Sequence, residues 1–196
     1  MSETAQPSQT DQEQKWILQL QNPQTNQKER TIAFDGIMRL HRRAIYSHIR
    51  KMVIDADDTD DLLQETFVKV WKNMDKFKNE SKLYTWIYRI ATNETLRFLE
   101  NKKKKYGLPL NETSEELMQN LVSDEQFSGE EVQNILQKAI LTLPDKQRLV
   151  FNMKYFDEMK YEDISQIVDT SVGALKASYH LATKKIEAYL KENYQT

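Results

Sequence analysis

Residues 58–101 read DTDDLLQETFVKVWKNMDKFKNESKLYTWIYRIATNETLRFLEN, and this stretch decides the fold. It contains two long helical patterns separated by a polar loop, Lys76–Lys82. We expect the first helix to begin with Thr59 as its N-cap, because two acids follow and favour the positive end of a helix. The second pattern begins at about Leu83. In both patterns apolar residues recur at helical spacing and form one stripe, which predicts two helices that each bury one face.

The polar face of the second helix carries residues that suit a nucleic-acid groove. Arg89, Asn93 and Arg97 follow one another at steps of four, so they share that face. Arg and Asn make bidentate contacts to base edges in the major groove, and the lysine run 102–105 can neutralise phosphates. Aromatic residues alternate with cations in this region, as on surfaces that bind single strands. The alternative is structural: Trp86 alone favours a place in the core, and a lysine run also occurs at solvated helix ends.

Composition predicts an all-helical protein. Among 196 residues only four are Gly and four are Pro, 30% are charged, and alternating strand patterns are missing. The lack of cysteine excludes a disulfide framework, a thiolate metal site and a cysteine nucleophile, and fits a cytoplasmic protein. No apolar run approaches the roughly 18 residues of a membrane span, and the N-terminus has no signal-peptide core. The net charge of −2 means that any DNA binding depends on local basic patches.

The segments outside the central stretch divide the rest of the chain. Residues 1–30 are polar, and we predict a mostly disordered tail. Its apolar run Trp16–Leu18 is compatible with a transient turn, which we favour, or with a short docking helix. Residues 31–54 predict a helix or helix pair with a basic polar side. His41 and His48 there have no partner at metal-ligand spacing, so we expect no metal site.

Composition changes after the lysine run. Residues 106–131 contain seven acids and no Lys or Arg, so we expect a flexible acidic linker over 106–130. It is either simply solvated or a self-masking arm that occupies a basic channel. Residues 131–196 form the second unit, with helices expected over 131–141, from Pro144 to about Tyr155, over Tyr161–Val168 and from Val172 to about Glu192. A short helix, a tight turn and a longer helix predict a helix-turn-helix, with the last helix as the reader.

These two units together resemble the extracytoplasmic-function (ECF) group of bacterial RNA polymerase sigma factors, over roughly residues 33–104 and 131–190. The resemblance to sigma region 2 (31–105) and region 4 (131–196) depends on the following residues: Asp61–Phe67, Trp71, Phe77 and Thr85–Asn93 in the first, and Leu143, Pro144, Arg148, Phe151, Tyr155, Tyr161–Ile164 and Ser171–Lys176 in the second.

The resemblance implies a non-enzymatic specificity subunit whose partners are core RNA polymerase, promoter DNA and an anti-sigma factor. Asp61, Gln64 and Glu65 lie largely off the apolar stripe and would face the β′ clamp helices, while region 4 would dock on the β flap. It implies no cofactor, no small-molecule substrate and no insertion into a membrane.

The resemblance also assigns two sets of DNA-binding residues. The loop before the second helix would capture a base flipped from the melted −10 element, and the helix would hold the duplex upstream. The last helix would read the −35 element. The implied −10 residues are Phe77, Asn79, Ser81, Lys82, Trp86, Arg89, Asn93 and Arg97, and the implied −35 residues are Ser171, Lys176, Tyr179, His180 and Lys184.

Some residues depart from the family pattern, and other readings compete with it. Arg97 stands where an acid is usual, and Asp169 where glycine is common in the turn, although Asp tolerates a left-handed conformation. The recognition helix has fewer arginines than usual, which predicts few phosphate contacts at −35. A free-standing helix-turn-helix regulator would leave Asp61 and its neighbours unexplained. A helical adaptor that sequesters a partner would leave two basic helices unexplained.

Overall fold

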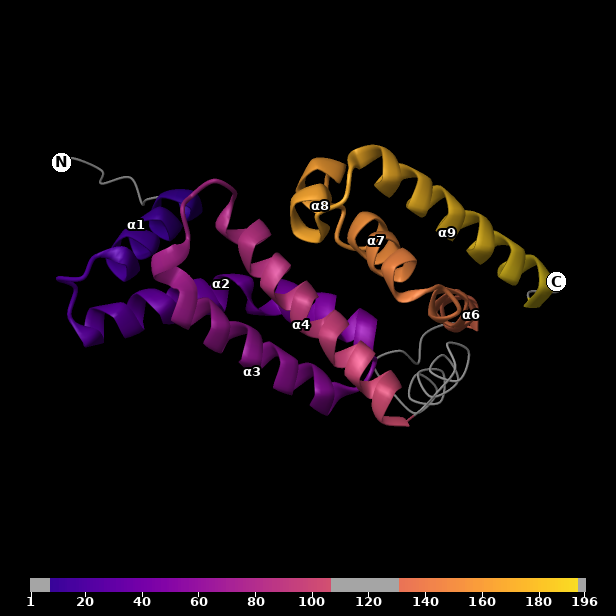
Figure 1. The fold of residues 1–196 in the computed structure, drawn as a ribbon, viewed down its shortest axis with the longest axis horizontal. Helices are drawn as coiled ribbons and strands as arrows, with labels where there is room; N and C mark the ends of the chain where they lie inside the picture. The colour runs from indigo at the N-terminus through magenta and orange to yellow at the C-terminus, as the bar shows by residue number, and fades with distance from the viewer. Residues whose placement is uncertain (1–7, 107–130, 194–196) are drawn as a thin grey trace, which may run out of the picture.

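The computed structural model describes residues 8–106 and 131–193, and all regular structure in these two ranges is helical. The prediction of an all-α fold with two small helical units is therefore confirmed (Figure 1). The linker was expected over residues 106–130, and all of these except Tyr106 lie outside the described ranges. The helices are α1 (Gln9–Gln21), α2 (Gln27–Val53), α3 (Ala56–Asn73), the short 3₁₀ helix η1 (Met74–Lys76), α4 (Leu83–Tyr106), α6 (Glu131–Leu141), α7 (Asp145–Tyr155), α8 (Tyr161–Val168) and α9 (Val172–Asn193).

The first unit is built from α1–α4, with α2, α3 and α4 packed around an aliphatic and aromatic core. The residue that caps α3 differs from the predicted one. Asp55 accepts a hydrogen bond from the Asp58 backbone at 2.8 Å and starts the helix at Ala56, so the prediction of Thr59 as N-cap is wrong. Thr59 is fully buried one turn later, and its hydroxyl donates to the Asp55 carbonyl at 2.6 Å.

The predicted disordered tail is wrong for the described residues up to 30, because Gln9–Gln21 form helix α1 and Gln27 begins α2. Ser8 and Asp11 cap α1 reciprocally, each side chain bonding the other residue's backbone N–H. Ile17 and Leu20 are buried in the core of the first unit. The tail has little apolar surface of its own, but α2 supplies the missing partner surface, and burial of the two side chains offsets the cost of ordering.

The second unit contains the predicted helix-turn-helix, formed by α8 and α9 with α6 and α7 beneath them. The predicted bounds Tyr161–Val168 are confirmed. Asp169 closes α8 in the left-handed conformation (φ 50°), as expected for an Asp in a position that glycine often takes. Leu175 on α9 and Ile164 on α8 are buried between the helices of this unit.

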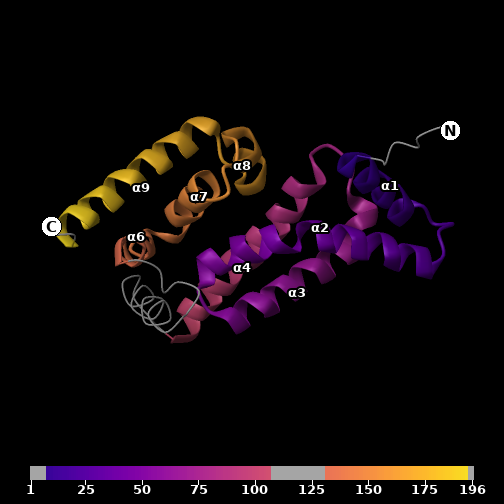
Figure 2. The same ribbon diagram turned by 180° about the vertical axis from the view of Figure 1, so that it is seen from behind.

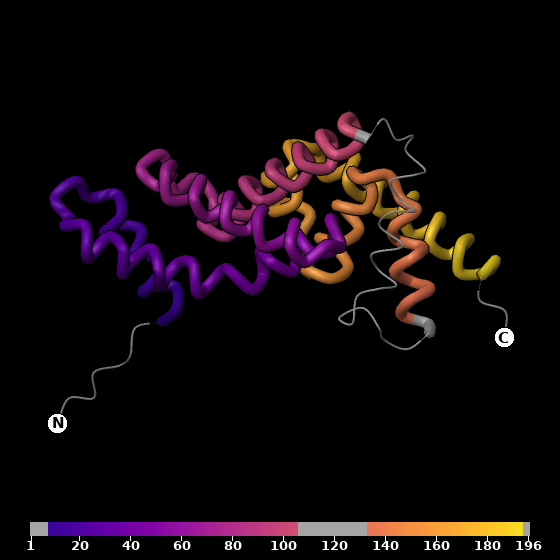
Figure 3. Tube along the Cα trace, turned by 90° about the horizontal axis from the view of Figure 1, so that it is seen from below, coloured from indigo at the N-terminus to yellow at the C-terminus, as the bar shows by residue number. Residues whose placement is uncertain are grey.

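The two units pack directly against each other. Helix α8 lies along α4, and α7 lies against the C-terminal part of α2, as both faces of the molecule show (Figures 1 and 2). One cluster of buried side chains runs from Ile45 of α2 and Ile87 of α4 into Leu149 and Met153 of α7. Seen from below, the second unit stands against one end of the elongated first unit (Figure 3). We call this packing the closed arrangement.

Candidate nucleic-acid and polymerase interfaces

An acidic groove lies between α3 and α4. Asp61 and Glu65 line it, and Gln64 is exposed beside them on α3. The groove has a volume of about 290 Å³. Exposed carboxylates do not contribute to packing of the core. Their negative charge instead makes this groove complementary to a basic partner surface. Its other lining residues are Asp58, Leu62, Glu94, Arg97, Phe98 and Asn101.

Arg97, which the sequence groups with the predicted DNA-facing residues, lines this groove. Its guanidinium is paired with the nearly buried carboxylate of Glu94, which also pairs with Lys69 of α3. Desolvation and repulsion from Arg97 lower the pKa of Lys69. Arg89 instead lines a different cavity, and Asn93 is exposed between the two on α4. The predicted continuous face of three residues is therefore divided between two surfaces.

The second cavity, of about 530 Å³, lies where the loop 77–82 meets α4 and the end of α8. Half-buried Trp86 and exposed Arg89 line it, and together they offer an aromatic face and a cation to an unpaired base. Gln166 and Asp169 of the second unit close its far side. The remaining lining residues are Lys76, Phe77, Lys78, Glu80, Ser81 and Thr85.

The residues of the loop differ in how far they can reach a ligand. Phe77 is only 4% exposed and packs on Trp86 with ring centroids 5.2 Å apart, so it supports the loop from below. Asn79 is exposed and has a positive φ of 58°, which turns the chain at the tip. Ser81 is half-buried, and exposed Lys82 lies 3.8 Å from Asp163 of α8.

The predicted −35 residues lie at the start and along one side of α9. Lys176, His180 and Lys184 are exposed at steps of four. Ser171 caps the helix, with its hydroxyl accepting from the Ala174 backbone at 3.3 Å. Tyr179 is different, because it is half-buried and stacks on Phe151 with centroids 5.7 Å apart. Its ring therefore holds α9 onto α7 within the second unit. Lys185, the remaining cation of this stretch, donates to Gln147 at 3.0 Å.

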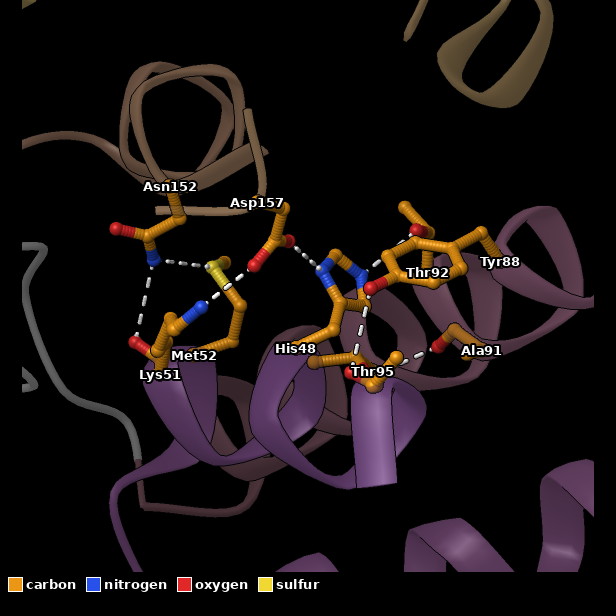
Figure 4. Close-up of polar contacts among 10 residues, drawn as sticks. His48, Lys51, Met52, Tyr88, Ala91, Thr92, Thr95, Asn152 and Asp157 are labelled. Atoms are coloured by element: carbon orange, nitrogen blue, oxygen red, sulfur yellow. Dashed lines mark hydrogen bonds and ion pairs between the residues drawn. The ribbon is translucent and has the colours of Figure 1, made fainter. Parts of the chain in front are cut away.

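A polar cluster missed from the sequence joins the two units (Figure 4). Asp157, just after α7, accepts from Lys51 of α2 at 2.5 Å and lies 3.5 Å from Nδ1 of His48. His48 is fully buried, and its Nε2 lies 2.9 Å from the Thr92 hydroxyl on α4. Burial alone would raise the pKa of Asp157, but His48 and Lys51 outweigh it and hold that pKa below its usual value.

Two further side chains of α7 bond the C-terminal end of α2. Arg148, almost fully buried, donates to the Met52 carbonyl at 3.2 Å, and Asn152 donates to the Lys51 carbonyl at 3.4 Å. Helix ends leave carbonyls without intrahelical partners, so the second unit stabilises the end of α2. No local sequence pattern could have revealed this cluster, because Lys51 and Asp157 are 106 residues apart.

Two properties of the described ranges bear on the chemistry. None of the helices there is both long and apolar enough to cross a membrane. Within residues 8–106 and 131–193, no group of three or more His, Cys, Asp or Glu side chains is placed to hold a metal ion.

Comparison with known proteins gives consistent matches over both units. The family models Sigma-70 region 2 and Sigma-70, region 4 match residues 37–105 and 133–186. The chain is 30% identical to "ECF RNA polymerase sigma factor SigW" of Bacillus subtilis over 168 residues, which is 82% of this chain and 90% of that protein. It is 27% identical to "ECF RNA polymerase sigma-E factor" of Escherichia coli K12 over 170 residues, 79% of this chain and 85% of that protein.

Two solved structures share the fold. The first is CnrH in complex with the cytosolic domain of CnrY, with a TM-score of 0.66, 21% identity and coverage of 94% of this chain and all of that one. The second is the sigma factor RpoE of Bartonella quintana in complex with the anti-sigma factor NepR, with a TM-score of 0.63, 20% identity and coverage of 82% and 98%.

Proposed function

The chain belongs to the ECF group of RNA polymerase sigma factors, which act in transcription initiation, and from this premise we propose how its surfaces divide that work. Residues 31–105, within the first unit, bind the polymerase and the −10 element, and residues 131–196 bind the −35 element. The observation that carries the proposal is the separation of a cavity lined by Trp86 and Arg89, near the start of α4, from an acidic groove further along the same helix.

Polymerase binding is assigned to Asp61, Gln64 and Glu65. All three are exposed on α3 beside the groove, and the carboxylates of Asp61 and Glu65 suit a partner surface that offers cations, which we assign to the clamp helices of the β′ subunit. Glu94 and Arg97 form the opposite wall, and because Glu94 is already paired with Arg97 and Lys69, a basic partner side chain entering the groove would meet the carboxylates of α3. As in other sigma factors, the protein serves as a dissociable specificity subunit, while catalysis belongs to the polymerase.

Capture of the −10 element is assigned to the loop and the adjacent face of α4. A flipped base would enter the cavity between the loop and Trp86, bounded by Ser81 and Arg89. Stacking and pocket contacts then offset the few kcal/mol that unstacking a base costs, and this trapping drives strand separation. Asn79 and Lys82 are exposed on the loop and Asn93 is exposed on α4 one turn after Arg89, whereas Phe77 contributes by supporting Trp86.

The −35 element is assigned to the exposed side of α9, where Lys176, His180 and Lys184 lie. Ser171 is positioned at the N-terminus of this helix, where backbone N–H groups favour phosphate. We further propose that an anti-sigma factor regulates the protein, because related folds are seen with CnrY and NepR bound.

The function is tested by run-off transcription on fragmented genomic DNA of the source bacterium. Sigma-free core polymerase is used with and without the protein, and the transcripts are sequenced. We expect discrete new start sites that need the protein and share two upstream elements. DNA binding by the protein alone, without new starts with the cognate polymerase, would instead establish a free-standing regulator.

The recognition helix is tested by Lys176→Ala combined with Lys184→Ala. We expect weaker promoter binding, and a slope of log affinity against log salt reduced by about 2, because each phosphate contact contributes about 1. The double variant should also lose its dependence on the −35 element, measured on promoters with and without it. Lys191→Ala, exposed further along α9, is the matched control. An equal loss on both promoters would contradict the assignment of α9.

A further inference from the structure

Helix α1 lies outside the part of the chain that matches region 2, which begins at residue 37. It nevertheless contacts the base of the loop 77–82, which we assign to the −10 element. The Nε2 of Gln21, the last residue of α1, donates to the Phe77 carbonyl at 2.5 Å and to the Met74 carbonyl at 3.3 Å. The Phe77 carbonyl begins the loop 77–82, and Met74 is the first residue of η1, which precedes it. Helix α1 is also in direct contact with η1.

Three further contacts fix α1 on the first unit, so that Gln21 is held in place. A methyl group added to Gly36 of α2 would lie 2.4 Å from the indole of Trp16, so the ring lies directly on the α2 backbone. His41 of α2 is joined to Glu13 at 2.6 Å. Arg30 donates to the Leu20 carbonyl at 2.6 Å and so bonds the end of α1.

Residues 77–82 belong to no helix or strand, and Asn79 at the tip of this loop has positive φ. Its conformation therefore depends on its two ends. At the C-terminal end, Trp86 N–H donates to the Lys82 carbonyl at 3.1 Å as α4 begins. At the N-terminal end, the Phe77 N–H donates to the Met74 carbonyl at 3.2 Å, and the Gln21 side chain bonds the Phe77 carbonyl.

We propose that α1 positions the promoter-recognition loop, with Gln21 as the positioning residue. This inference rests on the proposed role of the loop in capturing a −10 base. Gln21 does not touch DNA: it acts by keeping Phe77 under Trp86 and by holding the start of the loop at one edge of the cavity. Loss of its two hydrogen bonds leaves the polymerase-binding groove intact but lets the loop and the cavity wall shift.

The test uses full-length protein in holoenzyme, on a promoter found by run-off transcription. Gln21→Glu keeps the side-chain size but replaces the donor with a carboxylate facing two carbonyl oxygens. Gln14→Glu makes the same chemical change at an exposed position of α1 and is the control. We expect Gln21→Glu to slow open-complex formation roughly tenfold, as the loss of two hydrogen bonds predicts, with core-polymerase affinity unchanged within twofold.

Base discrimination separates positioning from a general folding defect. Open-complex rates are measured on the preferred −10 sequence and on one substituted at the captured base. A smaller folded fraction would lower both rates equally, whereas a misplaced loop lowers their ratio, which we expect for Gln21→Glu and not for Gln14→Glu. An unchanged ratio in both variants would overturn the inference.

A second variant disturbs the docking of α1 through its contact with α2. Gly36→Ala places a methyl group against Trp16, so it displaces α1 without changing any residue of α1 or of the loop. Alanine suits a helix interior, so α2 itself is not weakened. We expect the same loss of base discrimination as for Gln21→Glu. Normal discrimination in Gly36→Ala would mean that docking of Trp16 does not control the loop.

A loop variant separates this inference from the proposed function. Asn79→Ala with Ser81→Ala removes polar groups of the loop itself. If this variant keeps full discrimination, the assignment of the loop to the −10 base fails. If it loses discrimination while Gln21→Glu and Gly36→Ala do not, only the positioning role of α1 fails.

Discussion

Asp157→Asn is expected to open the closed arrangement. The substitution keeps the side-chain size but removes the charge that pairs with Lys51 at 2.5 Å and lies 3.5 Å from buried His48. Breaking a buried ion pair costs about 3 kcal/mol at the lower end of the known range, which shifts the equilibrium between closed and open forms more than 100-fold. The check is the distance between dyes on α4 and α9, measured at pH 7 by energy transfer.

The pH dependence of this contact has a defined sign. Because the pKa of Asp157 is held below its usual value, its contribution is fully present above the unfolded-state pKa of about 3.9 and is lost as pH falls through the lower folded-state pKa. Neutral pH therefore shows the full effect. Glu162→Gln, an exposed change of the same kind on α8, is the control. Identical dye distances in Asp157→Asn and the wild type would contradict this role of the ion pair.

Opening matters because the closed arrangement cannot bind a whole promoter. Elements centred roughly 25 base pairs apart are about 85 Å apart along B-DNA. In the closed arrangement α8 packs on α4, and Asp169 lines the same cavity as Arg89. We therefore expect Asp157→Asn to bind core polymerase faster than the wild type, since less free energy is needed to separate the units.

Asp61→Ala combined with Gln64→Ala is expected to weaken binding to core polymerase at least 30-fold. Loss of about 2 kcal/mol is typical for central interface residues, and the effect should shrink at high salt because charge is involved. Both residues are exposed, so the free energy of unfolding should change by less than about 0.5 kcal/mol. Binding is measured by fluorescence anisotropy with labelled protein.

The matched control for the groove is Gln14→Ala with Glu192→Ala, which changes one amide and one acid at exposed positions outside it. It should leave polymerase affinity unchanged. If the Asp61/Gln64 variant binds as tightly as this control, the polymerase surface lies elsewhere. A loss of affinity together with a lower melting temperature would point to damage of α3 instead.

The sequence predicted best the parts of the fold that depend on local chemistry. The bounds of α8 and the left-handed Asp169 follow from spacing and turn preference within a few residues. The predicted start of α3 was wrong because Thr59 is buried by packing, and Asp55, four residues earlier, caps the helix instead. Helix α1 had a usable signal, since Ser8 and Asp11 stand at capping-box spacing, but its weak apolar pattern depends on α2 for burial.

The candidate site was predicted less completely, because side-chain direction on a helix depends on neighbours distant in sequence. Asp61 and Glu65 are exposed as expected, since an apolar stripe defines its own opposite face. Phe77 was expected at the DNA but is buried, because Trp86 covers it. The ion pair of Lys51 with Asp157 joins separately predicted units, so no periodicity could reveal it.

The contact of α8 with α4 also has a consequence during synthesis on the ribosome. Helix α4 ends at Tyr106, and α8 ends at Val168. The ribosome adds the roughly 60 intervening residues in about 3–12 s. Throughout that interval the nascent first unit has no α8 to cover α4, so its cavity is open to ligands. A nascent chain can therefore bind a partner through its first unit before its second unit has been synthesised.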